Sequence, residues 1–309
     1  MLALLMLVAG VFVLALQDSL IKWLAPTTSF WQIQTLRSIG NISFIILLGF
    51  VSGGLQLLVP KRLKPVLLRA VCLAICMFFF FAASPQLSVA QMAAGLYTYP
   101  LFVSLLAGPV LGERVGVWRI GAVVLGALGA LAVLNPLDSA FSGLQLMPVL
   151  GGFFYACNLL ILRRACRDES PLALTFAVAI LFFISGAVGA IILSLIPVAL
   201  SLRQEMPFIF IGWPEVGWVL IGFALIASML NLSGNILLAR AYQTADSSWL
   251  APIDFSYLLF AAFWGRVLFD RWPEPLALLG MLMIAAAGMI TAWRERRKDG
   301  PDGDAGIKA

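Results

Sequence analysis

Apolar stretches of roughly twenty residues follow one another through this sequence, and most charged residues lie between them or at their ends. A bilayer core about 30 Å thick is crossed by about 20 residues of helix, because each residue adds about 1.5 Å. The pattern therefore predicts an all-α integral membrane protein with ten transmembrane helices. The expected spans cover residues 2–24, 30–50, 67–83, 87–111, 117–134, 144–162, 172–200, 216–239, 247–268 and 276–293.

The composition leaves no room for a soluble domain. Hydrophobic residues make up 62% of the 309 residues and charged residues 11%, which is too little polar surface to cover a soluble protein of this length. The longest segment between two predicted spans has about fifteen residues, too few for a soluble catalytic or nucleotide-binding domain. A net charge of +5 would suggest nucleic acid in a soluble protein, but here the position of the basic residues explains it.

Basic residues are distributed unevenly between alternate loops. One set of loops, together with the C-terminal tail, contains fifteen of the 20 Lys and Arg residues, whereas the other set contains three. The positive-inside rule places the basic set in the cytoplasm, and an even number of spans then puts both termini there. We expect a bacterial inner-membrane protein whose tail, residues 294–309, is disordered. The first span lacks a basic n-region and a small-residue cleavage site, so we expect a retained helix and not a signal peptide.

The ten predicted spans divide into two sets of five whose ends resemble each other. Leu111-Gly112-Glu113 closes the fourth span and Leu268-Phe269-Asp270 closes the ninth, and the helix after each carries two glycines eight residues apart. Because each half has an odd number of spans, the second half must cross the membrane in the opposite sense. Inverted repeats of this kind recur in transporters, where the substrate site lies near the midplane between the halves.

Several motifs resemble the EamA repeat of the drug/metabolite transporter superfamily. The first copy shows Tyr99-Pro100-Leu101-Phe102, Leu111-Gly112-Glu113-Arg114 and Asn135-Pro136, and the second shows Leu238-Ala239-Arg240-Ala241-Tyr242, Ala251-Pro252 and Phe269-Asp270. The opening Leu16-Gln17-Asp18-Ser19-Leu20-Ile21-Lys22, with Gln32 and Arg37-Ser38, is similar to a bacterial branch that includes riboflavin and S-adenosylmethionine permeases, and more distantly to amino-acid exporters. The resemblance implies EamA repeats at residues 1–135 and 144–293 and a role in transport. Asp270 departs from the family, which usually has Glu there.

Charged residues inside the first two spans are the first candidates for a functional site. Asp18 and Lys22 are four residues apart and therefore share a helix face. Counting along the two helices places Asp18 and Arg37 at one depth, roughly 10 Å below the outer surface. A charge in the hydrocarbon costs about 3 kcal/mol and normally faces a cavity or a partner. Two interpretations stay open, namely a structural salt bridge between the spans and a site that binds substrate or a proton.

The other acid inside a span is Asp254, toward the cytoplasmic side, and its nearest basic residue along the chain is Arg266, three turns away. Because the sequence contains no histidine, Asp18 and Asp254 are the plausible proton carriers inside the membrane. Uncharged polar side chains add further candidates for substrate contact, although hydrogen bonding between helices is an alternative role for each. They are Tyr97, Tyr99, Asn158 and Tyr257, and the tyrosine rings suit a planar metabolite.

The sequence argues against the competing classes of membrane protein. Because the sequence has no histidine, Ser-His hydrolysis, imidazole base catalysis and histidine-ligated metal sites are excluded. An enzyme would have to use the carboxylates of Asp18 and Asp254, but the count along the spans places these two residues at different depths. A channel or a passive scaffold would need neither an inverted repeat nor buried charges of both signs. The sequence carries no phosphate-binding loop, so we expect a gradient-driven secondary transporter for a small polar or amphipathic metabolite, working by alternating access.

We expect this transporter not to be an enzyme and to use no cofactor or metal. Its expected partners are a small-molecule substrate and the lipid bilayer, without nucleic acid, and a homodimer is an arrangement that the sequence leaves open. Substrate identity, the direction of transport and the coupling ion also stay open.

Overall fold

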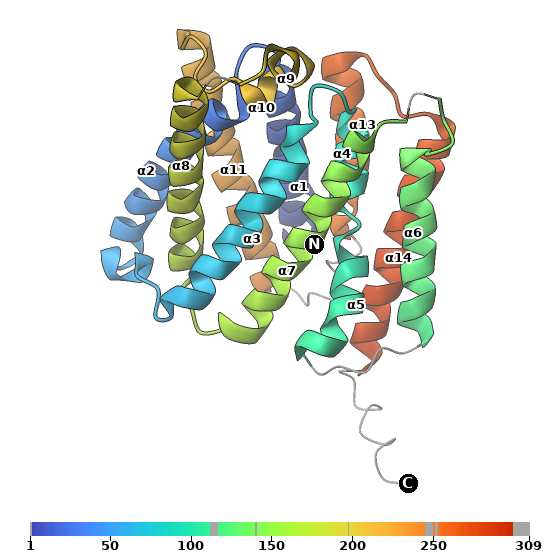
Figure 1. The fold of residues 1–309 in the computed structure, drawn as a ribbon. Coiled ribbons are helices and arrows are strands. Elements are labelled where there is room, and N and C mark those ends of the chain that lie inside the picture. The colour runs from blue at the N-terminus through green and yellow to red at the C-terminus, as the bar shows by residue number, and fades with distance from the viewer. Residues whose placement is uncertain are drawn as a thin grey trace.

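The computed structural model describes residues 2–111, 117–139, 141–196, 198–244, 250 and 253–298. Within these ranges all regular elements are helices, and Figure 1 shows them as one bundle whose helices run between two opposite ends. Seven described helical segments are long and apolar enough to cross a membrane, and three shorter apolar helices lie at 120–134, 256–269 and 275–290. The protein is therefore an all-helical, multi-pass membrane protein.

The first half of the chain follows the expected order of spans. Its helices are α1 (Leu2–Leu24), α2 (Phe30–Ser52), α3 (Leu63–Ala82), α4 (Val89–Leu96), α5 (Tyr99–Leu111) and α6 (Val117–Leu134), with the short 3-10 helix η1 (Leu55–Leu58) before α3. Helix α2 begins after Ser29, whose side chain accepts a hydrogen bond from the Gln32 backbone N–H and so caps the helix.

The second half contains η2 (Gly143–Leu146), α7 (Met147–Ala165), α8 (Pro171–Leu195), α9 (Leu200–Glu205), α10 (Pro207–Phe210), α11 (Trp218–Thr244), α13 (Ser256–Phe269) and α14 (Pro275–Lys298). Most predicted boundaries differ by a few residues, and two of these differences change what was expected between or after the spans. The span expected at 172–200 ends at Leu195, and two short helices follow it. Helix α14 continues past residue 294, where the disordered tail was expected to begin, and residues 299–309 lie outside the described part of the chain.

The span expected at 87–111 is interrupted in its middle. Helix α4 ends at Leu96 and α5 begins at Tyr99, because Pro100 provides no backbone N–H for the Leu96 carbonyl. At the break, the Leu101 N–H donates to the Thr98 carbonyl at 3.0 Å. The second half has a break before α13, where the Leu258 N–H donates to the Phe255 carbonyl at 3.1 Å.

Helices from the two halves pack against each other throughout the bundle. The most extensive contacts join α1 with α11, α2 with α8, α3 with α7, and α6 with α14, and smaller ones join α1 with α13, α4 with α7, and α4 with α13. Small residues allow close approach, as at Gly129 of α6, where an added Cβ would lie 2.7 Å from the Gly280 carbonyl oxygen of α14. The central helices α1, α4 and α13 share one buried apolar cluster, which contains Tyr97 and Tyr257.

Candidate functional site

The two interrupted spans bring a group of tyrosine side chains together at the centre of the bundle. Tyr97, at the end of α4, stacks on Tyr257 of α13 with ring centroids 5.1 Å apart and planes 13° from parallel. Tyr99 meets Tyr97 edge to face at 5.8 Å, and Tyr155 of α7 meets Tyr99 edge to face at 4.9 Å. These four residues form the tyrosine cluster, in which both halves of the chain take part.

Both intramembrane acids adjoin this cluster. The Tyr257 hydroxyl donates to the carboxylate of Asp18. The Tyr97 hydroxyl donates to the backbone carbonyl of Asp254 at 3.2 Å, and the Asp254 carboxylate interacts with the hydroxyls of Tyr97 and Tyr99. Counting along the helices assigned Asp18 and Asp254 to different depths, whereas in the structure two stacked rings connect them.

Asp18 is held by a short chain of amides as well. The Gln17 Nε2 donates to Asp18 at 2.8 Å, and the Gln17 Oε1 accepts from Nδ2 of Asn231, on α11, at 2.8 Å. Gln17 is 1% exposed, so this chain of hydrogen bonds crosses the interior between α1 and α11. The contact fixes Asp18 against a helix of the other half.

Arg37 lies on α2 and is 4% exposed, but it does not form the salt bridge that the sequence left open. Its Nη2 donates to Gln34 Oε1 at 3.2 Å, and no ion pair between Arg37 and Asp18 occurs in the part of the chain that the structure describes. The charges still attract each other over a longer distance. The reason is local, because Tyr257 and Gln17 already bind the two carboxylate oxygens of Asp18.

The remaining candidates have separate environments. Lys22 does not pair with Asp18; its Nζ donates to the Ser84 carbonyl and lies 5.2 Å from the centroid of the Phe269 ring. Asn158 is 2% exposed and its Oδ1 has no hydrogen-bond partner. The structure therefore brings Asp18, Asp254 and three predicted tyrosines together, but leaves Asn158 and Arg37 outside this group.

Sequence reasoning did not select Tyr155 or Gln17. Tyr155 is one of the protein's 5 tyrosines and lies one turn before Asn158. Its position on the same helix face as this candidate could have identified it. Gln17 directly precedes Asp18, but its partner Asn231 is 214 residues away, and only the packing of α1 on α11 reveals it. Within the described residues no group of three His, Cys, Asp or Glu side chains is placed to hold a metal ion.

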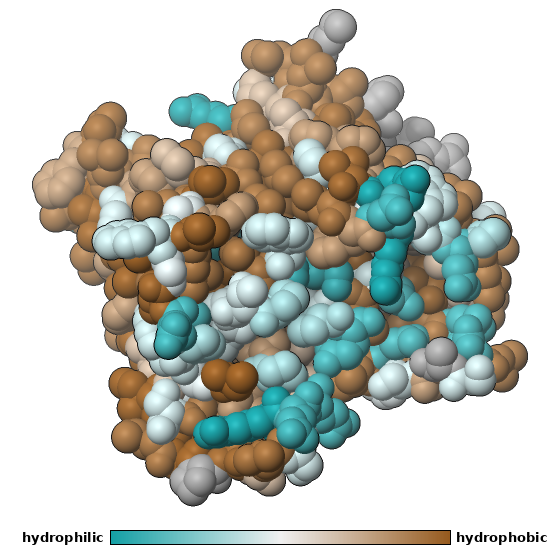
Figure 2. All heavy atoms as spheres, turned by 90° about the horizontal axis from the view of Figure 1, so that it is seen from above, coloured by the Kyte–Doolittle hydropathy of each residue, from teal (hydrophilic) through white to brown (hydrophobic). Residues whose placement is uncertain are grey.

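A cavity of about 470 Å³ opens at the end of the bundle where α1 ends, α4 begins and α13 ends. We call it the Lys22 cavity. Figure 2 looks onto this end and shows hydrophilic side chains gathered toward the middle of the face, with hydrophobic ones around them. The lining residues are Lys22, Trp23, Pro26, Pro85, Leu87, Ser88, Val89, Ala90, Ala262, Gly265, Leu268, Phe269, Arg271, Trp272 and Pro273. Lys22 lies one turn beyond Asp18 on α1, so the cavity adjoins the site at the tyrosine cluster.

Comparison with known proteins gives a family match for the first part of the chain. Residues 1–135 match the EamA-like transporter family, which is the family that the motifs resemble. The motif residues 112–114 and 251–252 lie outside the described part of the structure.

Individual relatives are distant. The chain is 27% identical over 223 residues to a riboflavin transporter of Vibrio cholerae, covering 71% of this chain and 68% of that protein. It is 24% identical over 288 residues to a pseudopaline exporter of Pseudomonas aeruginosa, covering 92% and 93%. A crystal structure of a protein with 17% identity has the same fold, with a TM-score of 0.55 over 96% of this chain and 99% of that chain. The two named relatives are transporters, which agrees with the membrane-spanning helices and with the family match over residues 1–135.

Proposed function

We propose that this protein is a secondary transporter that moves a small polar or amphipathic metabolite across the bacterial inner membrane by alternating access between two five-helix halves. The observation that carries the proposal is the pair of interrupted spans, α4–α5 and the span that ends in α13, which meet at the tyrosine cluster. In secondary transporters, substrate sites form where discontinuous helices from two repeats meet.

The packing of the helices supports an internal repeat. In the proposed repeat, the five spans of the first half, α1, α2, α3, α4–α5 and α6, correspond in that order to α7, α8, α11, α13 and α14. Replacing each helix by its counterpart converts the contact of α1 with α11 into the contact of α7 with α3, which also occurs. The contact of α1 with α13 is likewise converted into that of α7 with α4. Three further contacts, α2 with α8, α4 with α13 and α6 with α14, each join two helices that are counterparts of one another, so the exchange leaves them unchanged. Exchange of the two halves therefore reproduces the main contacts of the bundle.

Two loop contacts support an inverted relation between the halves. The Ser29 hydroxyl, between α1 and α2, donates to the Gly212 carbonyl just before α11 at 2.7 Å. The carboxylate of Glu169, between α7 and α8, accepts from the backbone N–H groups of Lys61 and Arg62, just before α3, at 2.8 and 2.7 Å. The two contacts join equivalent segments, and in Figure 1 these loops lie at opposite ends of the bundle, as an inverted repeat requires.

The tyrosine cluster is the proposed substrate site. Tyr97 and Tyr257 are 7% and 5% exposed, so a solute reaches these rings only when α4 and α13 separate, which alternating access would provide. Stacked rings flanked by Asp18 and Asp254 suit a planar metabolite with polar substituents. A flavin, suggested by the name of the Vibrio cholerae relative, has that shape.

Transport by purified protein tests the proposal. Reconstituted into liposomes and offered labelled riboflavin, S-adenosylmethionine and a panel of amino acids, the protein should move at least one of these solutes faster than protein-free liposomes. Tyr257→Leu should remove most of the flux. Phe154→Leu should retain it, because Phe154 stacks on Phe79 (centroids 6.0 Å apart, 9° between planes) in a pair separate from the tyrosine cluster. Hydrolysis or group transfer without movement of any solute would favour the carboxylate enzyme instead.

Reporter fusions test the proposed topology. Fusions after Lys64, after Arg167 and at Ala309 should report the cytoplasm, whereas fusions after Thr27, Asp138 and Gln204 should report the outside, because the basic loops stay inside. A cytoplasmic signal after Asp138 would contradict the inverted arrangement, because it would change the number of crossings in the first half.

A further inference from the structure

We propose that the Lys22 cavity binds the transported solute through an anionic group, so that the substrate of this protein is a planar organic anion. The proposal rests on the transport function proposed above and narrows its substrate class. It is carried by four features of the cavity: two cations, the start of a helix, an aromatic lining, and the absence of acids from its described walls.

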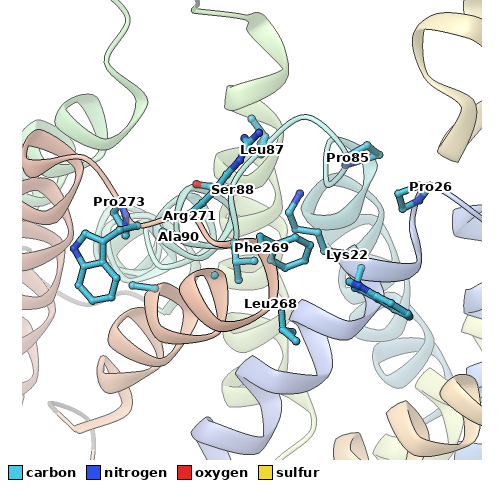
Figure 3. A pocket seen from close by; sticks show the side chains of 15 residues that line it. Lys22, Pro26, Pro85, Leu87, Ser88, Ala90, Leu268, Phe269, Arg271 and Pro273 are labelled. Atoms are coloured by element: carbon cyan, nitrogen blue, oxygen red, sulfur yellow. The ribbon is translucent and has the colours of Figure 1, made fainter.

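Lys22 and Arg271 bring two positive charges to the same space. Lys22 comes from the end of α1 and Arg271 follows α13, and the two cations are close enough to interact unfavourably. Figure 3 shows that the side chains of Lys22, Phe269 and Arg271 converge at the start of α4. Two like charges held together in one concave site favour a counter-ion of opposite sign.

No acid of the described walls supplies that counter-ion. Asp270 is next to Arg271 in the chain, but it pairs with Arg266 and does not line the cavity. Glu274 is exposed and also lies outside the lining. Asp18 lies one turn below Lys22 and accepts from Tyr257 and Gln17 instead. The positive charge of the cavity is therefore available to a solute.

The first turn of α4 adds backbone donors to the same wall. Ser88 and Gln91 form a capping box, in which the Ser88 hydroxyl accepts the Gln91 N–H at 3.2 Å and the Gln91 side chain accepts the Ser88 N–H at 2.9 Å. The N–H groups of Val89 and Ala90 lie in the first turn of the helix, where no intrahelical acceptor exists, and both residues line the cavity. The positive end of the helix dipole reinforces Lys22 and Arg271.

Aromatic side chains make the cavity suitable for a planar molecule. Trp23, Phe269 and Trp272 line it together with apolar residues such as Leu87 and Leu268. The volume of about 470 Å³ falls in the range of about 300–1,000 Å³ typical of small-molecule sites. Aromatic faces bind a ring system while the cations and the helix start bind its acidic group, and this combination selects a planar anion over a neutral analogue.

Flavin mononucleotide and riboflavin are matched probes, because they share a ring system and differ by one phosphate. Equilibrium dialysis against the purified full-length protein in detergent at low salt should show about fivefold or more tighter binding of flavin mononucleotide, and added salt should reduce the difference. Arg271→Gln and Lys22→Met should each reduce that preference severalfold. Arg167→Gln should not, because it removes the same charge from the α7–α8 loop at the opposite end of the bundle.

Arg271 is exposed, so Arg271→Gln keeps the test valid even if Lys22→Met folds poorly after losing its bond to Ser84. Charge reversal by Arg271→Glu should make riboflavin the tighter ligand of the two. Equal affinities for the two probes, no binding of flavin mononucleotide, or a preference unchanged by Arg271→Gln would overturn the anion site. If one of these results were found but liposomes made from the same preparation moved a solute, the transport function would stand and only the anion site would fail. If the protein preferred flavin mononucleotide as expected but moved no solute, only the transport function would fail.

Discussion

In the proposed repeat, helices α1 and α7 hold equivalent places, since α1 packs on α11 and α13 while α7 packs on α3 and α4. Aligning Gly10 of α1 with Gly151 of α7 also aligns Phe12 with Phe153 and Ala15 with Ala156. The same alignment sets Asp18 against a leucine, Leu159. The backbone environment is thus repeated, whereas the charge is present in one copy.

The interrupted spans differ in the same way. Matching Leu268-Phe269-Asp270 to Leu111-Gly112-Glu113 aligns Asp254 with Tyr97, and these two residues are hydrogen-bonded to each other. Each half therefore contributes one acid at a position where the other half has none. In the proposed repeat, the matched positions account for the packing of the helices, while the unmatched acids mark the residues that we expect to handle substrate or protons.

The largest effect is expected at Asp18. Asp18→Asn keeps an oxygen that accepts from Tyr257 but removes the charge, so it should reduce transport at least about tenfold, roughly 1.4 kcal/mol or more, and it should lower the folded yield because Arg37 loses its long-range counter-charge. Initial rates in proteoliposomes and the monodisperse yield measure the two effects. Leu159→Ala, at the equivalent position of α7, should leave more than about half of the flux. Equal losses in the two variants would remove the proposed functional difference between the halves.

Arg37 separates the structural interpretation of Asp18 from the functional one. Arg37→Gln should lower the folded yield, because it leaves the buried Asp18 charge without its long-range counter-charge. The loss should be smaller than the about 3–5 kcal/mol that breaking a buried ion pair costs, because Asp18 keeps its bonds to Tyr257 and Gln17. In the double variant Asp18→Asn/Arg37→Gln, recovery of the fold without transport would support a role in the substrate path. Recovery of both would show that Asp18 serves only the fold.

An intermediate effect is expected at Asp254. If transport is coupled to protons, Asp254→Asn should abolish the response to an imposed pH gradient while transport down a solute gradient continues, because an amide carries no exchangeable carboxyl proton. Rates with and without the gradient measure this, and Asp138→Asn, outside the membrane-spanning helices, is the matched control. An Asp254→Asn protein that keeps its full response to the gradient would refute this coupling role.

The smallest effect compares the two aligned amides. Gln17→Ala removes the hydrogen bond between α1 and α11 and the bond to Asp18, so at about 0.6 kcal/mol for each bond within the membrane it should lower stability by roughly 1 kcal/mol. Asn158→Ala should cost less, because its Oδ1 makes no hydrogen bond. Thermal unfolding in one detergent checks the order, and a larger loss for Asn158→Ala would show that the second amide has a structural role after all.

The spans themselves were predictable because the length of an apolar run determines whether it can cross a bilayer. The bounds expected for 2–24 and 117–134 coincide with α1 and α6. Pro148 falls inside the span expected at 144–162, whereas in the structure it lies in the first turn of α7, where its missing N–H costs little. The local sequence alone did not show whether Pro148 lies in the middle of the helix or in its first turn.

The arrangement of the site was less predictable, because counting residues along a helix assumes that the helix is continuous. The break at Phe255 invalidates that count for Asp254, and the break at Thr98 lets Tyr97 of the other interrupted span stack on Tyr257. The sequence identified Asp18, Asp254 and three of the four clustered tyrosines by residue type. It did not indicate their partners, since those are set by contacts between segments more than 150 residues apart.

The break between α4 and α5 also has a mechanical consequence. It divides one crossing into two rods, about 12 and 20 Å long at 1.5 Å per residue, that meet at Tyr97 and Thr98. Directly opposite lies Gly152 of α7, where an added Cβ would be 2.8 Å from the Leu96 carbonyl oxygen and 2.8 Å from the Thr98 hydroxyl. Because glycine has no side chain, α7 packs directly against the backbone at the break, and any side chain at position 152 would push the two segments away from α7.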